Sequence, residues 1–214
     1  MTQNRSTAVM QRRHEAHDSL DDFPTPPWAT RALCEWLTGQ GWNLSRLSVR
    51  EPAANRGFMA RPLGESFGTV MASDVHDYDV GFPQEDYLFP GADRPADWTI
   101  TNPPFRLAED FIRTALESSL SGVAMIVRGA FLEGVGRYQN LFSVTPPTDV
   151  LQFCERVPMV KGKYDPLATT ATSYAWFVWQ FDRPQGETRL HWIPQCRKRL
   201  ERPDDAVLEP GGLA

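Results

Sequence analysis

The chain has 214 residues, and 41% of them are hydrophobic, which fits one large domain with a substantial core. A formal net charge of −5 excludes a general attraction to nucleic acid, so a nucleic-acid partner has to meet a local basic patch. Three scattered cysteines without CxxC spacing, and histidines without a metal-ligand pattern, argue against a disulfide framework and a bound metal. We expect a cytoplasmic protein, because the sequence shows neither an apolar leader nor an apolar run of membrane length.

The sequence begins with a polar stretch and continues into an amphipathic helix. We expect residues 1–20 to form a flexible arm and residues 21–195 to form the folded domain. In TPPWATRALCEWLTGQG (25–41), Thr25 is a candidate N-cap, and the two prolines suit the first turn of a helix. The apolar side chains recur at helical spacing, which predicts one buried face. This face consists of Trp28, Ala32, Leu33, Trp36 and Leu37.

Strand and helix patterns then alternate along the chain. Strands are expected within residues 46–57, 68–77, 97–105, 122–129, 149–160, 173–181 and 188–194. Helices are expected within residues 58–66, 106–120 and 136–143, the first of them broken near Pro62. This alternation, followed by a terminal hairpin, predicts an α/β fold with a mostly parallel sheet and antiparallel strands at the C-terminal end. Residues 196–214 are charged and then rich in Pro and Gly, so we expect a partly disordered tail.

Side chains suited to chemistry stand at the ends of the first three expected strands. Glu51 follows the first strand and opens a turn of small, turn-tolerant residues, and Asp74 follows the second strand. A tight turn with an acid about 20 residues later is the spacing of nucleoside-binding sites, where the acid binds the ribose hydroxyls. The third strand runs into TNPPF (101–105), in which two prolines stiffen the chain and keep Asn102 out of the helical region.

The NPPF stretch, downstream of such a turn and acid, resembles the catalytic motif of S-adenosylmethionine-dependent amino-methyltransferases. The closest resemblance is to DNA adenine-N6 methyltransferases of the small type found in phages and mobile elements. DFPTP, EPAANRG, SDV and EDYL resemble the cofactor motifs of that family, in a gamma-like order and over roughly residues 20–180. The resemblance implies a Rossmann-like class I methyltransferase fold with a seven-stranded sheet. One departure is Asn55, which stands where the family usually has glycine; asparagine best tolerates the positive φ of such a turn.

The resemblance also implies S-adenosylmethionine as the cofactor, no metal, and a role for each motif residue. The implied cofactor-binding residues are Phe23, Thr25, Pro26, Glu51, Ala53, Asn55, Gly57, Asp74, Val75, Asp86, Tyr87 and Asn102. The implied catalytic residues are Asn102, Pro103, Pro104 and Phe105. The Asn102 side chain and the Pro103 carbonyl would accept the hydrogens of the adenine amino group, and Phe105 would stack on a target base flipped out of duplex DNA or presented by single-stranded DNA. Tyr87 is as readily explained by core packing.

The sequence alone leaves other interpretations of the function open. An RNA base amino-methyltransferase shares this type of tetrapeptide, and a protein glutamine methyltransferase usually carries Tyr in place of Phe105. An inactive cofactor-binding relic, or a subunit that needs a partner, is a further alternative, and the sequence does not define the oligomeric state.

Residues 153–166 are a candidate loop over the catalytic pocket. Trp176 and Trp179 are expected in the core, and His76 and His191 at the surface or in packing.

Several basic residues are candidates for contacts with nucleic-acid phosphates. They are Arg12, Arg13, Arg128, Arg137, Arg156, Lys161, Lys163 and Arg197–Arg199. A few such contacts make binding sensitive to salt. A solvated surface charge is an equally good explanation for any single one of them.

Overall fold

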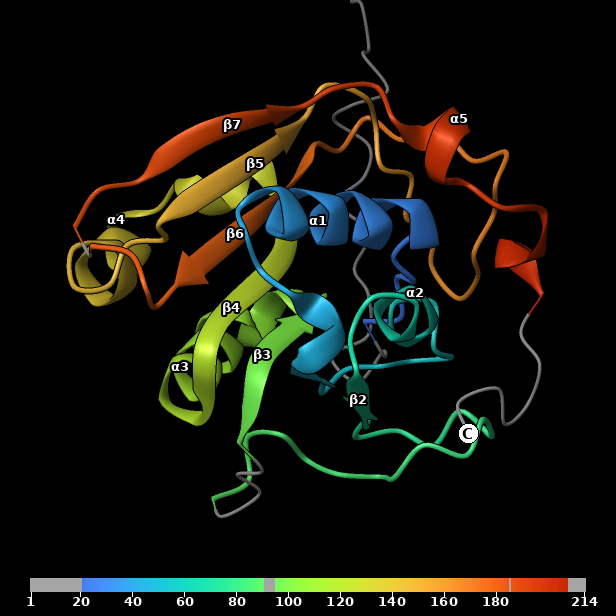
Figure 1. Ribbon diagram of the computed structural model, residues 1–214, viewed down its shortest axis with the longest axis horizontal. Helices are drawn as coiled ribbons and strands as arrows, with labels where there is room; N and C mark the ends of the chain where they lie inside the picture. The colour runs from blue at the N-terminus through green and yellow to red at the C-terminus, as the bar shows by residue number, and fades with distance from the viewer. Residues whose placement is uncertain (1–20, 91–94, 185, 208–214) are drawn as a thin grey trace, which may run out of the picture.

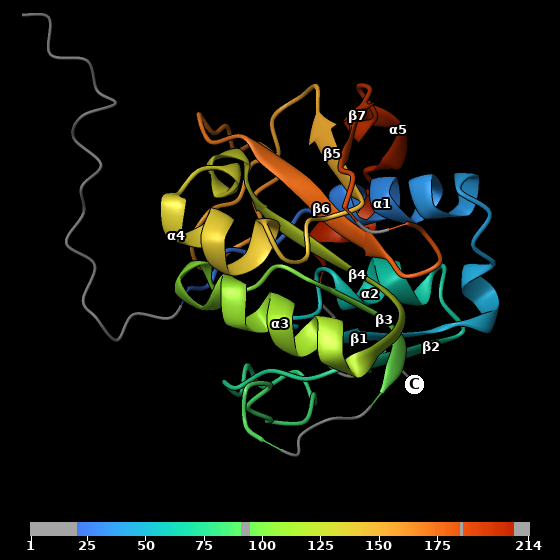
Figure 2. The same ribbon diagram turned by 90° about the vertical axis from the view of Figure 1, so that its left-hand side faces the viewer.

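The structure is a computed structural model that describes residues 21–90, 95–184 and 186–207. The expected arm at residues 1–20 lies outside the described residues. A seven-stranded sheet crosses the molecule, with helices on both of its faces (Figure 1, Figure 2). Its spatial order is β2-β1-β3-β4-β6-β5-β7. The strands are β1 (Ser48–Glu51), β2 (Thr69–Ala72), β3 (Ala96–Thr101), β4 (Ser119–Arg128), β5 (Asp149–Phe153), β6 (Tyr174–Gln180) and β7 (Arg189–Ile193).

The sheet is mostly parallel, which confirms the expected fold class. Strands β2, β1, β3 and β4 are parallel neighbours, while β6 runs antiparallel to both β4 and β5. The expected terminal hairpin takes another form, because β7 pairs in parallel with β5 through the Val150–Leu190 register and not with β6. Both edges of β6 are already occupied by β4 and β5, so β7 cannot pair with β6 and pairs with the outer edge of β5.

The helices divide between the two faces of the sheet (Figure 2). The face covered by α1 (Pro27–Gly39), α2 (Ala60–Gly64) and α5 (Arg197–Leu200) buries Trp28, Leu63 and Leu200. The opposite face carries α3 (Ala108–Ser118), α4 (Val135–Arg137) and the π-helical turn η5 (Tyr138–Phe142). The short 3-10 turns are η2 (Leu44–Arg46), η3 (Phe105–Leu107), η4 (Gly129–Leu132) and η6 (Pro203–Ala206).

Alternation along the central strands separates two hydrophobic cores. In β4, Ile126 packs with the α1 side and Met125 with the α3 side, because successive side chains of a strand point to opposite faces. In β6, Trp176 and Trp179 are both fully buried and belong to opposite cores. The expectation that these two tryptophans are core residues is therefore confirmed.

Two expectations about helix boundaries are wrong. Helix α1 begins after Pro26, which makes no side-chain cap, so Thr25 is not the N-cap. Pro62 does not break α2, because it occupies the first turn, where backbone N–H groups have no intrahelical acceptor.

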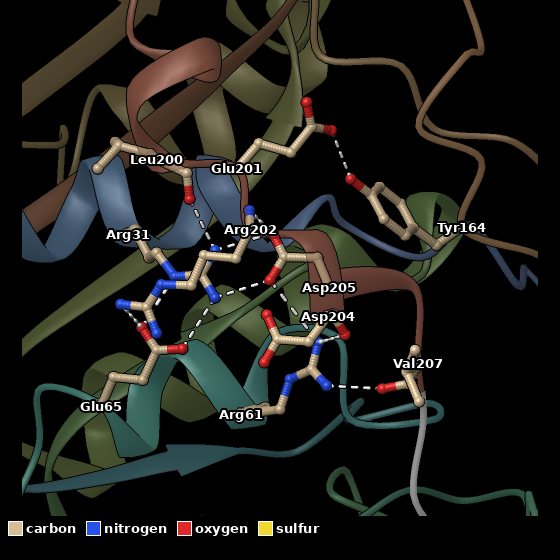
Figure 3. A network of polar contacts seen from close by, with 10 residues as sticks. All are labelled: Arg31, Arg61, Glu65, Tyr164, Leu200, Glu201, Arg202, Asp204, Asp205 and Val207. Carbon is tan, nitrogen blue, oxygen red and sulfur yellow. Dashed lines mark hydrogen bonds and ion pairs between the residues drawn. The ribbon is translucent and has the colours of Figure 1, made fainter.

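The segment after β7 packs on the domain through a buried ion-pair network (Figure 3). The guanidinium of Arg31 in α1 binds the carboxylate of Asp205 at 2.7 and 2.8 Å and that of Glu65 at 2.8 Å. It also donates to the carbonyl of Leu200 at 2.7 Å. Asp205 is 1% exposed. Residues 196–207 are thus attached to α1 and α2, and residues 208–214 of the expected tail lie outside the described residues.

Candidate active site

The carboxyl ends of the parallel strands β1, β2 and β3 lie at one edge of the sheet, as a parallel arrangement requires. A cavity of about 260 Å³ opens there. Eleven of the expected site residues line it: Phe23, Thr25, Glu51, Ala53, Asn55, Asp74, Val75, Asp86, Tyr87, Asn102 and Pro104. The remaining four do not: Pro26, Gly57, Pro103 and Phe105. Residues distant in sequence, from the loop before α1 to the start of α3, therefore meet at one place.

The turn after β1 keeps the shape of a glycine-rich loop although Asn55 replaces a glycine. Asn55 has a φ of 51°, in the left-handed region, and Gly57 has a φ of 89°. The Asn55 amide nitrogen of the backbone donates to the Asp74 carboxylate at 2.8 Å. Its side chain donates to Asp22 at 2.6 Å, and Asp22 also pairs with Arg56 at 3.1 Å. The asparagine thus preserves the turn and fastens it to the loop before α1.

Asp74 is held at the end of β2 by backbone donors. One carboxylate oxygen accepts from the Asn55 N–H at 2.8 Å and the other from the His76 N–H at 2.9 Å. Burial raises the pKa of Asp74, and these hydrogen bonds oppose the rise. Each oxygen keeps a further lone pair, so the carboxylate can still accept hydroxyl hydrogens from a ligand in the cavity.

Glu51 is a fully buried carboxyl group beside the same cavity. Its Oε1 accepts from the Thr101 hydroxyl and from the Ala53 N–H at 3.2 Å. Its Oε2 and the hydroxyl of Thr25 have no hydrogen-bond partner among the described residues. Buried polar atoms without partners are costly, so these two atoms at the cavity wall are available to a ligand or a water molecule.

Burial, with a contribution from the nearby Asp74 charge, raises the pKa of Glu51 from 4.5 to about 8. The folded protein without ligand therefore keeps a proton that the unfolded chain has lost between these pH values. We expect the free energy of unfolding to fall as the pH rises from about 4.5 to about 8, by on the order of 4 kcal/mol. Urea unfolding at several pH values measures this slope.

The control for this prediction is Glu51→Gln, which is neutral throughout that pH range. Its slope should be shallower than that of the wild type, and what remains should come from other groups such as Asp74. Parallel pH profiles of the two proteins would show that Glu51 is ionised in the folded state and would contradict the prediction.

The other residues that line the cavity differ in their exposure to solvent. Val75 is 57% exposed, and Asp86 is exposed with its carboxylate accepting from the Leu88 N–H at 3.0 Å. Tyr87 is 2% exposed, lies 5.1 Å from the Phe111 ring and has the Arg50 guanidinium 4.8 Å over its own ring. Tyr87 therefore serves core packing as well as lining the cavity.

The contacts of the amide nitrogen Nδ2 orient the Asn102 side chain. Nδ2 donates to the carbonyl of Phe23 at 2.8 Å and lies 3.7 Å from the sulfur of Met159. Both of these contacts use Nδ2, which leaves the carbonyl oxygen Oδ1 as an acceptor. After the two prolines, the backbone N–H of Phe105 donates to Asp21 at 2.6 Å, so the loop is anchored at both ends.

The ring of Phe105 lies next to Phe23, with ring centroids 6.0 Å apart. The guanidinium of Arg128 lies over this ring at 3.8 Å from its centroid. Sequence reasoning placed Arg128 among the phosphate candidates and did not foresee this contact, because nothing local in the sequence links β4 to the NPPF loop.

The segment expected over the catalytic pocket lies beside Asn102 and the loop before α1. Met159 contacts Asn102, and the Gly162 N–H donates to the carbonyl of Asp22 at 2.8 Å. Tyr164 places its ring 5.5 Å from Phe58, a residue that lines the cavity. Asp21, Phe58 and Tyr78 are cavity residues that the sequence analysis missed, since none of them belongs to a motif.

Some candidate phosphate contacts are engaged within the protein. Arg137 pairs with Glu109 at 3.1 Å, Arg197 with Glu201 at 3.2 Å, and Arg199 with Glu35 at 2.5 Å. Arg128, Arg156 and Lys163 are exposed, although Lys163 pairs with Asp165 at 3.0 Å. Arg12 and Arg13 lie outside the described residues.

The acidic side chains of the cavity determine which ligand charge it favours. Four acidic side chains line it, those of Asp21, Glu51, Asp74 and Asp86, of which Glu51 keeps its proton at neutral pH in the absence of a ligand, and no Lys, Arg or His side chain lines it within the described part of the chain. Such a wall suits a positively charged ligand and disfavours a polyphosphate. Across the described ranges, no cluster of three His, Cys, Asp or Glu side chains is arranged to hold a metal ion. The helices in those ranges include none that could cross a bilayer.

No protein-family model and no curated protein sequence matches the chain. Among solved structures, a candidate class I S-adenosylmethionine-dependent methyltransferase from Listeria monocytogenes has a TM-score of 0.60 and 11% identity, covering 82% of this chain and 67% of that one. A modification subunit of a candidate type I restriction enzyme from Vibrio vulnificus has a TM-score of 0.56 and 16% identity, and the match covers 91% of this chain and 51% of that one. A type I restriction-modification methyltransferase subunit from Streptococcus thermophilus has a TM-score of 0.55 and 9% identity, and the match covers 76% of this chain and 45% of that one.

The chain therefore has the fold of class I S-adenosylmethionine-dependent methyltransferases. It spans about half the length of the type I modification subunits that it matches. At these identities, the likeness concerns the fold.

Proposed function

We propose that the protein is an S-adenosylmethionine-dependent methyltransferase that methylates the N6 amino group of adenine in DNA. The observation that carries the proposal is that one cavity is lined both by the carboxyl groups of Glu51 and Asp74 and by the side chain of Asn102. The acids suit a positively charged nucleoside cofactor, and the asparagine suits an amino-group substrate beside it. The methyltransferase fold supports the same conclusion.

The residues of the cavity fit S-adenosylmethionine, which supplies an activated methyl group on a positively charged sulfur. The buried Oε2 of Glu51 and the hydroxyl of Thr25, which lack partners among the described residues, would bind the methionine end of the cofactor. Asp74 would accept the ribose hydroxyls. The exposed Val75 would pack on the cofactor's adenine, and Asp86 would accept from its amino group.

The contribution of the chain to the chemistry is made at the Asn102 loop. The amino nitrogen of adenine is a poor nucleophile because its lone pair is delocalised into the ring. Two acceptors, Asn102 Oδ1 and the Pro103 carbonyl, would hold the amino hydrogens and favour a pyramidal nitrogen. The two prolines stiffen the loop, so the acceptors do not have to reorganise during the reaction.

Access to this loop requires an unpaired base. An adenine inside a duplex cannot reach the acceptors, so it has to be flipped out or presented in a single strand. Phe105 would form the platform on which the target ring stacks. Direct in-line transfer to nitrogen then needs neither a covalent intermediate nor a metal.

The experiment offers labelled S-adenosylmethionine with duplex DNA, single-stranded DNA or RNA, followed by digestion of the products to nucleosides. We expect N6-methyladenine in DNA. Label in RNA alone would favour the RNA amino-methyltransferase, and label in protein alone would favour a glutamine methyltransferase. Binding of the cofactor without transfer to any acceptor would contradict the proposal and leave an inactive protein or one that needs a partner.

A further inference from the structure

Arg128 covers the surface that the proposed function assigns to the target base. It is the last residue of β4 and is exposed, and its guanidinium lies 3.8 Å from the centroid of the Phe105 ring. The register of β3 and β4 explains this position. Thr101, the last residue of β3, pairs with Met125 of β4, so Pro104 and Arg128, each three residues further along the chain, both lie at the carboxyl edge of the sheet.

A guanidinium at this distance excludes a base from the same face of the ring. Stacked aromatic rings have centroid separations of about 4.5 Å or more, and the planar guanidinium already occupies that space. Arg128 and a stacked adenine therefore compete for one face of Phe105.

Arg128 is the partner that can move. The Phe105 backbone is anchored by Asp21 at 2.6 Å, and its ring packs against Phe23 and the core. The backbone of Arg128 is held at the end of β4, where it pairs with Tyr174 of β6. Tyr174 is 4% exposed; burial raises the pKa of its phenol, and the nearby Arg128 charge opposes the rise. The guanidinium can thus leave the ring of Phe105 without any movement of the strand that carries it.

We propose that Arg128 is a gate on the target-base site, which covers Phe105 in the absence of nucleic acid and is displaced when the base stacks. The proposal rests on the proposed function, because it assumes that Phe105 is the base platform. Arg128 is then a positioning residue that acts on base entry, and not a phosphate contact. Its removal should favour base binding, whereas loss of a phosphate contact should weaken it.

The test measures the affinity of wild type and Arg128→Ala for a short single-stranded oligodeoxyadenylate and for an abasic strand of the same length. Both are measured with S-adenosylhomocysteine present and over a series of salt concentrations. Loss of an exposed cation–π contact predicts about 2–5-fold tighter binding of the oligodeoxyadenylate. The abasic strand, which has no ring to displace the arginine, should bind unchanged, and the salt dependence should stay the same.

Three further variants sharpen the measurement. Arg113→Ala removes the same charge from the outer side of α3 and should leave both affinities unchanged. Phe105→Leu removes the ring, so Arg128→Ala added to it should have no effect on oligodeoxyadenylate binding. Arg128→Gln keeps the length of the side chain and should reproduce the tighter binding if Arg128→Ala proves poorly folded by thermal unfolding.

Two results would overturn the gate. Arg128→Ala would identify a phosphate contact if it weakened binding of both strands and made the slope of log K against log[salt] less steep by about 0.7. Unchanged affinity for oligodeoxyadenylate would show that the arginine does not compete with the base. In either case methyl transfer by the wild type would still support the proposed function. Absence of transfer to any nucleic acid would instead overturn the function and the gate together.

Discussion

Replacement of Asn102 by alanine is expected to lower the rate of methyl transfer by about 10²–10³-fold, the usual effect of losing one preorganised polar group in an active site. The side chain offers Oδ1 as an acceptor because Nδ2 is already bound to the Phe23 carbonyl at 2.8 Å. Alanine removes that acceptor and leaves the proline-stiffened backbone in place. Single-turnover transfer to DNA with saturating cofactor measures the chemical step directly.

The scaffold should tolerate this substitution. Asn102→Ala also removes the hydrogen bond to Phe23, which predicts a loss of stability of about 1 kcal/mol. Asn43→Ala is a matched control, because Asn43 is exposed and lies outside the cavity. It should transfer methyl groups at the wild-type rate. A rate for Asn102→Ala within a factor of about 3 of the wild type would show that Oδ1 does not assist the reaction and would contradict the assigned role.

The strand ends that form the cavity could be predicted because they depend on local patterns. Alternation of strands and helices predicts a parallel sheet, and parallel strands bring Glu51, Asp74 and Asn102 to one edge. The tolerance of asparagine for a positive φ predicts that the turn survives at Asn55, and its φ is 51°.

Contacts between distant segments could not be predicted in this way. The pairing of β7 with β5 depends on which sheet edge remains available after β6 has been placed. That pairing gives His191 a partner, the buried Asp149 at 2.8 Å, although the sequence suggested none. The position of Arg128 over Phe105 likewise depends on the register of two neighbouring strands. Such contacts follow from tertiary packing, which a single sequence specifies only through the whole fold.

The buried network around Arg31 is the clearest example of a contact between distant segments, because Arg31 and Asp205 are 174 residues apart in the sequence. In the sequence, Arg31 is a basic residue in an amphipathic helix, and Asp205 lies in a charged segment that resembles a tail. In the structure they are 6% and 1% exposed, with two hydrogen bonds between them (Figure 3). Burial disfavours the charged form of Arg31, but the hydrogen bonds to Glu65 and Asp205 outweigh it and raise its pKa.

We therefore expect Arg31→Leu to lower the free energy of unfolding by about 3–5 kcal/mol, because it leaves Asp205 charged and buried without its main partner. Urea unfolding measures the loss. Arg199→Ala is the matched control: Arg199 also joins the C-terminal segment to α1, through Glu35, but this pair is solvent-exposed and should contribute little.

Addition of Asp205→Asn to Arg31→Leu tests the electrostatic cause. Asparagine is neutral and keeps an oxygen that can accept from the Arg202 N–H, as Asp205 does at 2.9 Å. The double variant should therefore be more stable than Arg31→Leu alone, since no unpaired charge remains buried. If the second substitution destabilises the protein further, the loss in Arg31→Leu arises from packing of the arginine stem, and the charge pairing is not what holds residues 196–207 on the domain.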